Sequence, residues 1–150
     1  MEYPEFPDGV DYTSIRDVLS GKTEKSVKIR GWIYRTRSSG NLAFVVVRDS
    51  TGVIQCTISK DKVDKSDFDG ASKALIESSV IIEGKPVKDD RAPGGWEIRT
   101  TKFGVFHFAD TFPITKDQSD DHLLNNRHLW LRSRSMVSAL KIRSTVFKAF

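Results

Sequence analysis

The sequence predicts an all-β fold with minor helices, in which five strands close into a small barrel. Three observations lead to this class. Residues 26–60 contain three short segments whose apolar residues recur at period two, separated by two turn signals. A helical pattern follows this meander. Two more strand patterns then flank a turn rich in Asp, Pro and Gly at 89–95. The predicted element order is therefore three strands, one helix and two strands.

The N-terminal region is expected to hold an arm and one short helix. Residues 1–12 are acidic and contain prolines, which is typical of a loosely held arm. A helix should follow at 15–19, because Thr13 and Ser14 can cap its start and Gly21 can end it. Such a helix would plug or flank the barrel.

The first three strands are expected at 27–34, 42–48 and 53–58, where β-branched residues are frequent. Their alternation predicts a core-facing set: Val27, Ile29, Ile33, Ala43, Val45, Val47, Ile54, Cys56 and Ile58. The opposite phase places Phe44 and Gln55 on the outer surface. The inverted phase of the second strand, with Phe44 in the core, is equally compatible with the pattern alone.

The remaining elements follow from turn residues and helical spacing. A helix is expected at 71–78 and strands at 80–85 and 96–108, with Glu97 pointing away from the core and a bulge at Gly104. Further on, helical patterns cover 122–134 and 135–150. The predicted organisation is a barrel domain at 1–110, a linker at 111–122 and a helical segment at 123–150.

Composition and charge narrow the function. The 150 residues include 38% hydrophobic and 29% charged residues, typical of a globular protein, and Cys56 is the one cysteine. The three histidines are too dispersed for a metal site, no signal peptide is evident and no apolar run could span a membrane, so we expect a cytoplasmic protein. Residues 26–60 carry six basic residues and one acidic residue, and residues 111–150 are also net positive. This distribution favours a local surface for a polyanion, although an ordinary solvated surface has similar charge.

An exposed ring among arginines is the chemistry that single-stranded nucleic acid requires. With Phe44 outside, it would lie near Arg35, Arg37 and Arg48, and could offer a plane for a base while the guanidinium groups neutralise phosphates. Trp32 and Tyr34 are compatible with packing beneath the N-terminal helix or with a contact to RNA, and the packing interpretation is favoured.

A long motif then points to a known family. The stretch GWIYRTRSSGNLAFVVVRDSTGVIQ at 31–55 resembles the G-W-V-x-x-x-R-x-x-G-x-x-x-F-x-x-x-R-D-x-x-G-x-x-Q signature of class IIb aminoacyl-tRNA synthetases. Their N-terminal anticodon-binding domain is an OB-fold, a five-stranded Greek-key barrel with the element order predicted above. The segment RHLWLRS at 127–133 resembles the start of the catalytic domain in the asparaginyl members of that family.

The resemblance implies specific binding residues. In this family an arginine, a stacking phenylalanine, a glutamine and a glutamate bind the uridine in the middle of the anticodon. The motif places the first three at Arg37, Phe44 and Gln55, and Glu97 is the acid at the start of the last strand. Beside this set, Arg30, Arg35 and Lys28 are expected to add phosphate contacts, and the alternative for these three residues is a solvated basic strand face. For Glu97 the alternative is a surface ion pair with Arg99 or Arg91.

The resemblance also implies the activity of a complete relative. Such a protein is an ATP-dependent asparagine–tRNA ligase that uses ATP and Mg²⁺ in its catalytic domain and forms a homodimer through that domain. This chain alone is expected to bind the tRNA anticodon loop, to hold no cofactor or metal, and to be inactive, because the catalytic motifs would lie beyond Phe150. The alternatives are an aspartyl or nondiscriminating relative, or a stand-alone OB-fold module for RNA or single-stranded DNA.

Overall fold

The computed structural model describes residues 11–23, 25–115 and 118–150. The chain divides into two compact units, Met1–Thr111 and Phe112–Phe150. The arm predicted at 1–12 lies outside the described residues, apart from Asp11 and Tyr12, and so does part of the predicted linker.

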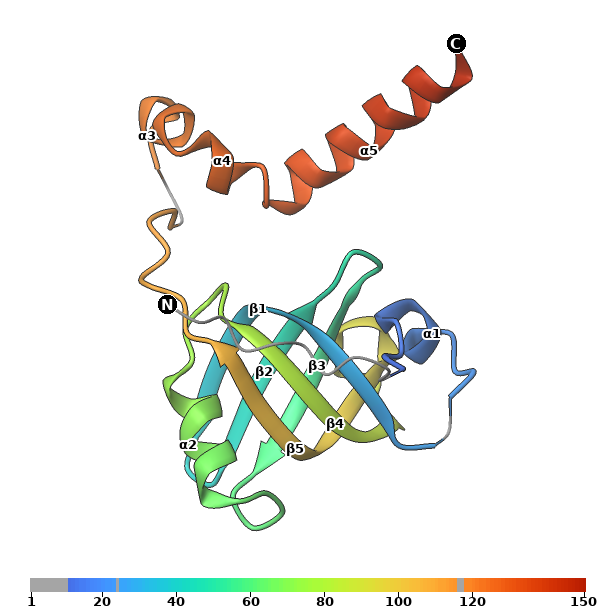
Figure 1. Cartoon of the computed structure of the whole chain (residues 1–150), viewed down its shortest axis with the longest axis vertical. Helices are drawn as coiled ribbons and strands as arrows, with labels where there is room; N and C mark the ends of the chain where they lie inside the picture. Colours follow the sequence, from blue (N-terminus) through green and yellow to red (C-terminus); the bar gives the residue numbers. More distant parts are fainter. Residues whose placement is uncertain (1–10, 24, 116–117) are drawn as a thin grey trace. The chain divides into compact units, whose positions relative to one another are not determined.

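The first unit is built around a closed five-stranded barrel (Figure 1). Its strands are β1 Val27–Ser39, β2 Leu42–Arg48, β3 Val53–Ser59, β4 Ser79–Lys88 and β5 Trp96–His107. The order around the barrel is β1-β2-β3-β5-β4, and β4 returns to pair with β1. The β3–β5 pair is parallel and the others are antiparallel. The predicted five-stranded barrel is therefore confirmed.

The interior of the barrel follows the predicted phases. Every residue of the core-facing set in the first three strands is buried, and Phe44 lies outside this core. Cys56 has no exposed surface, and its burial, with a smaller effect from the Glu97 charge, raises the pKa of its thiol. β1 is longer than predicted, because its polar end, 35–39, still pairs with β2 although none of it is buried.

The strand β1 pairs with a different neighbour in each half. It pairs with β4 through residues 27–32 and with β2 through residues 32–39, and its register with β2 shifts between Ile33 and Arg35. Near the point where the two pairings meet, a Cβ on Gly31 would overlap the backbone carbonyl oxygen of Arg48. Gly31 therefore allows the close approach of strands that closes the barrel.

The helix α1, Ile15–Leu19, is confirmed, and it is fixed to the turn between β2 and β3. The carboxylate of Asp49 accepts hydrogen bonds from the backbone N–H of Ile15 at 2.9 Å, of Thr51 at 2.6 Å and of Gly52 at 2.8 Å. Ile15 and Val18 are completely buried against the barrel. The carboxylate of Asp49 thus provides hydrogen-bond acceptors for the backbone N–H groups of both the turn and the start of α1.

The helix predicted at 71–78 is wrong in position, because α2 spans Lys65–Lys73. Its buried residues are Phe68 and Ala71, with Ala74 buried at the C-cap, and these recur every three residues, so the helix begins in the charged segment that precedes the predicted range. The chain leaves the helix at Ala74 and turns back through Glu77, which has φ of 72°. The Glu77 carboxylate accepts two hydrogen bonds from Arg48 Nη2, at 2.6 and 2.7 Å.

The bulge predicted at Gly104 is also displaced. Gly104 pairs regularly with Ile81 of β4. The register shifts lie on either side of it, between Ser79 and Val80 and between Glu83 and Gly84.

The second unit is helical, with α3 Asp120–Asn125, α4 Arg127–Trp130 and α5 Arg134–Ala149. The single helix predicted at 122–134 is broken at Asn126, whose φ and ψ of −106° and 28° depart from helical values. The hydroxyls of Ser119 and Ser133 accept hydrogen bonds from the first turns of α3 and α5. None of the helices in the described part of the chain combines the length and the apolarity needed to cross a membrane.

Candidate nucleic-acid interface

An aromatic ring and an arginine face each other across β1 and β2. Phe44 is directly opposite Arg37 in the antiparallel register, and it is half-buried on the outer side of the sheet. The guanidinium carbon of Arg37 lies 4.4 Å from the centre of the Phe44 ring. Arg37 is exposed, so the pair presents a flat cationic surface to solvent.

Arg35 belongs to the same surface. It is exposed and pairs with Val46, which lies two residues from Phe44 on β2. Its guanidinium carbon lies 5.4 Å from the ring centre of Tyr34. Arg35 and Arg37 therefore form a short basic row beside the Phe44 ring.

A hydrogen-bonded carboxylate lies on the neighbouring strands. Gln55 of β3 is opposite Glu97 of β5 in the parallel register, and Gln55 Nε2 donates to Glu97 Oε2 at 3.4 Å. Thr57 Oγ1 donates to the same oxygen at 2.8 Å. Thr57 is also the cross-strand partner of Phe44. This threonine therefore joins the aromatic pair to the carboxylate, and the four residues Phe44, Gln55, Thr57 and Glu97 form one continuous patch, the Phe44 patch.

Glu97 lies on the predicted side of the sheet, but it is much less exposed than a residue that contacts a ligand would be. Only 7% of its surface is accessible. Oε2 accepts from Gln55 and Thr57, and Oε1 lies 3.6 Å from Arg99 Nε. The ion pair with Arg99 that was considered as an alternative is thus present, whereas Arg91 pairs with Asp89 at 3.0 Å.

This arrangement fixes the direction of the Gln55 amide. A carboxylate only accepts hydrogen bonds, so the NH₂ group of Gln55 must face Glu97, and its carbonyl oxygen is directed elsewhere. The patch can therefore offer a stacking plane, an amide acceptor and nearby cations, which are the groups that an unpaired base with its phosphate requires.

Two of the arginines considered in the sequence analysis are not part of this patch. Arg48, which was expected near Phe44, lies at the other end of β2, where it is bonded to Glu77. Arg30 pairs with Ile81 of β4, and its guanidinium carbon lies 4.7 Å from the ring centre of Tyr12. Trp32, for which packing beneath the N-terminal helix and contact with RNA were both considered, is 44% exposed.

Sequence reasoning missed the central residue of the patch. Thr57 shares the outward phase of Gln55 on β3, so the period-two pattern contained the signal. Its bond to Glu97 depends on the parallel pairing of β3 with β5, which joins segments about 40 residues apart and leaves no local trace in the sequence.

Known proteins share this fold and much of this sequence. Residues 27–105 match the family model of the tRNA anticodon type, described as an OB-fold nucleic acid binding domain. The chain is 55% identical over 124 residues to an asparagine–tRNA ligase of Thermoplasma acidophilum, a match covering 83% of this chain and 29% of that protein. It is 34% identical to the asparaginyl-tRNA synthetase of Pyrococcus horikoshii solved with asparaginyl-adenylate, with a TM-score of 0.85, covering 93% of this chain and 33% of that one.

An aspartyl-tRNA synthetase of Entamoeba histolytica also has this fold, with a TM-score of 0.80, 22% identity, and coverage of 92% of this chain and 36% of that one. The chain thus spans about a third or less of the length of these proteins. Because the family model covers the whole barrel from β1 into β5, the chain belongs to the family of OB-fold nucleic-acid-binding domains of the tRNA anticodon type.

Proposed function

We propose that this chain is the anticodon-recognising part of an asparagine–tRNA ligase, and that the Phe44 patch with Arg37 and Arg35 binds an unpaired uridine of the anticodon loop. The observation that carries the proposal is the convergence of Phe44, Gln55, Thr57 and Glu97 on one outer face of the barrel. The identity of 55% to an asparagine–tRNA ligase supports the type of enzyme.

The chemistry of the patch favours uracil over cytosine. Uracil carries an N3–H donor, and the Gln55 carbonyl oxygen is free of the bond to Glu97 and can accept it. Cytosine has an unprotonated N3, which would place two acceptors against each other. Phe44 supplies the stacking plane, and Arg37 and Arg35 neutralise the phosphates on either side of the base.

Glu97 has a positioning role in this proposal and does not contact the base. Its two oxygens are engaged by Gln55, Thr57 and Arg99, and its surface is almost inaccessible. It orients the amide that binds the base. This differs from the direct contact expected from the family resemblance.

The aminoacylation chemistry would depend on parts of such a ligase that this chain does not span. Among the described residues, no cluster of three or more His, Cys, Asp and Glu side chains is arranged to hold a metal ion. The function that we assign to this chain is tRNA binding.

The test is a binding titration with anticodon stem-loop RNA. A hairpin with uridine in the middle of the anticodon should bind at least about tenfold more tightly than the same hairpin with cytidine there, at equal salt. A random oligonucleotide of the same length controls for charge. Equal affinity for all three RNAs would rule out anticodon recognition and leave a nonspecific nucleic-acid-binding module.

A second arm addresses the amino-acid specificity. Asparagine and aspartate tRNAs share the middle uridine and differ in the third anticodon base, which is U in GUU and C in GUC. Tighter binding of the GUU hairpin supports the asparagine assignment. Preference for GUC would favour an aspartyl enzyme, and equal binding of both a nondiscriminating one.

A further inference from the structure

A row of side chains crosses the strands of the barrel and continues the Phe44 patch beyond β3. Each member is the direct cross-strand partner of the next, in the order Arg37 of β1, Phe44 of β2, Thr57 of β3, Arg99 of β5 and Lys85 of β4. Residues directly opposite each other in a sheet project from the same face. Arg99 and Lys85 therefore lie on the outer face that carries the Phe44 ring, and we call these five residues the cross-strand row.

The contacts of Glu97 agree with this placement. Thr57 Oγ1 donates to Glu97 Oε2 at 2.8 Å, and Arg99 Nε lies 3.6 Å from Glu97 Oε1. One carboxylate therefore contacts the row from both β3 and β5. The Arg99 guanidinium is thus held beside the Phe44 patch.

The two ends of the cross-strand row are cationic. Arg37 lies at one end, and Arg99 and Lys85 lie at the other. Neighbouring strands are about 4.8 Å apart, so along the curved surface Arg99 is roughly 10 Å and Lys85 roughly 14 Å from Phe44. Both cations therefore lie beyond a base that stacks on Phe44, where they face the next nucleotide of a strand that follows the row.

Arg99 can bind a second acceptor while it contacts Glu97. Its side chain is 61% exposed, and the contact with Glu97 is made by Nε. A guanidinium also carries N–H donors on its two terminal nitrogens, and their planar arrangement suits the oxygens of a phosphate.

Lys85 adds a second cation next to Arg99. Its side chain is exposed, and within the described ranges of the chain no hydrogen bond or ion pair engages its ammonium group. Two acidic residues close to it in the chain are each paired with another cation. Glu83 pairs with Lys28 at 2.9 Å, and Asp89 pairs with Arg91 at 3.0 Å. A phosphate at Lys85 would therefore meet a net positive surface.

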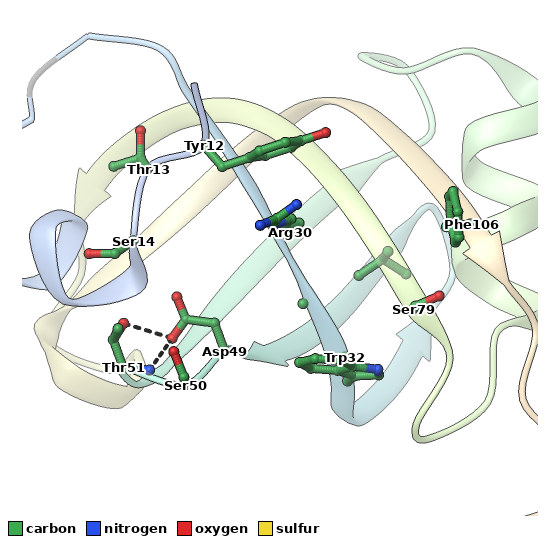
Figure 2. Close-up of a pocket in the computed structure, with 12 residues that line it drawn as sticks. Tyr12, Thr13, Ser14, Arg30, Trp32, Asp49, Ser50, Thr51, Ser79 and Phe106 are labelled. Atoms are coloured by element: carbon green, nitrogen blue, oxygen red, sulfur yellow. Dashed lines mark hydrogen bonds between the residues drawn. The ribbon is translucent and has the colours of Figure 1, made fainter. Parts of the chain in front are cut away.

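The two cations of β1 that were expected to bind phosphates outside this row are placed differently. Arg30 is opposite Ile81, which is four residues from Lys85 along β4, or roughly 13 Å. Figure 2 shows Arg30 beside Tyr12 on the first half of β1. Lys28 is engaged by Glu83. Arg99 and Lys85 are therefore better placed to receive the strand as it leaves the Phe44 patch.

We propose that Arg99 and Lys85 bind the phosphate of a nucleotide flanking the base on Phe44, so that the RNA strand crosses the barrel along the cross-strand row. The ligand chemistry is the sugar–phosphate backbone of a single strand, beyond the phosphates that Arg35 and Arg37 neutralise. The inference rests on the proposed function of the Phe44 patch and adds the direction in which the strand leaves it. Such contacts contribute affinity and not base specificity.

The test is filter binding of the middle-uridine hairpin over a salt series. One phosphate contact on a single strand contributes about 0.7 to the slope of log affinity against log salt. Lys85→Gln should therefore reduce this slope by about 0.7, which corresponds to about fivefold weaker binding at about 0.1 M salt and similar binding near 1 M. Arg99→Gln should reduce the slope likewise, and Arg99→Lys, which keeps the charge, should retain it.

A matched control removes a cation of the same strand outside the row. Lys102 is exposed on β5 and is opposite Glu83, three residues beyond Arg99. Lys102→Gln should leave the slope unchanged. Thermal unfolding of each variant checks that the barrel persists.

The cytidine hairpin separates this inference from the proposed function. A phosphate contact does not read the base, so Lys85→Gln should weaken both hairpins equally and leave their affinity ratio unchanged. Equal binding of the two hairpins by the unaltered chain is the failure of the proposed function, and it is read without any variant. An unchanged slope in folded Lys85→Gln and Arg99→Gln overturns the inference, and so does an equal loss of slope in Lys102→Gln.

Discussion

Replacing Phe44 with alanine should weaken binding of the middle-uridine hairpin at least tenfold. The ring is half-buried on the outer side of β2 and lies 4.4 Å beneath the guanidinium of Arg37. Removing it takes away one base-stacking plane, which contributes about 1–3 kcal/mol. The contact between Phe44 and Arg37 is already present without RNA, so its energy does not add to the loss of affinity. A loss of about 1.4 kcal/mol is tenfold, and the middle of the stacking range exceeds it.

The same substitution should have little effect on the fold. The inward neighbours Ala43 and Val45 are completely buried and unaffected, so the barrel core remains intact. We expect the free energy of unfolding to fall by about 1 kcal/mol or less, as for most changes outside a core. Denaturant unfolding followed by circular dichroism measures this.

The assay is filter binding of the hairpin at one salt concentration, repeated across a salt series. Stacking is uncharged, so Phe44→Ala should lower affinity equally at every salt concentration and leave the salt dependence unchanged. Phe44→Tyr serves as the matched control and should retain most of the affinity. Affinity of folded Phe44→Ala within twofold of the unaltered chain would refute the assignment of this ring to base stacking.

Two further changes test the positioning network and the closure of the barrel. Thr57→Val keeps the strand shape and removes the 2.8 Å hydrogen bond to Glu97. It should reduce the discrimination between the uridine and cytidine hairpins by about fivefold or more and leave the salt dependence of binding unchanged. Undiminished discrimination would show that Glu97 does not need the Thr57 hydrogen bond to orient Gln55. Gly31→Ala brings a Cβ against the Arg48 carbonyl and should lower the free energy of unfolding, measured by denaturant titration, by about 3 kcal/mol. Gly40→Ala is the control, because Gly40 lies at a turn with open space around it and a φ of 59°. This substitution should lower the free energy of unfolding by only about 1 kcal/mol. Equal costs for the two glycines would contradict a close approach at Gly31.

Local alternation predicted the positions of the barrel strands and, for the first and third strands, which side chains face the core. β2 begins and ends at the predicted residues, and the inward sets of the first three strands are all buried. The reason is that a small barrel has one inside and one outside, so the side-chain period of two translates directly into burial. The same rule placed Gln55 on the outer face, whereas the pattern of the second strand alone left both phases open, and the structure places Phe44 outside the core.

The incorrect predictions share a different origin. α2 begins several residues before the predicted range, because Phe68, which packs it against the core, lies in a highly charged segment without an evident helical pattern. Arg48 was grouped with Phe44 because they are close in sequence, yet four residues along a strand span roughly 13 Å. The near-burial of Glu97 depends on partners from β3, which no local pattern reveals.

The single thiol of the chain allows the opening of the candidate binding strand, β3, to be measured without a bound ligand. Cys56 is completely buried, its pKa is raised, and it lies between Gln55 and Thr57 on β3. An alkylating reagent can therefore reach it only when that strand separates from its neighbours. The rate of its modification would report how often the barrel opens beneath the Phe44 patch, and a bound RNA that holds this face together would slow the reaction although it never touches the sulfur.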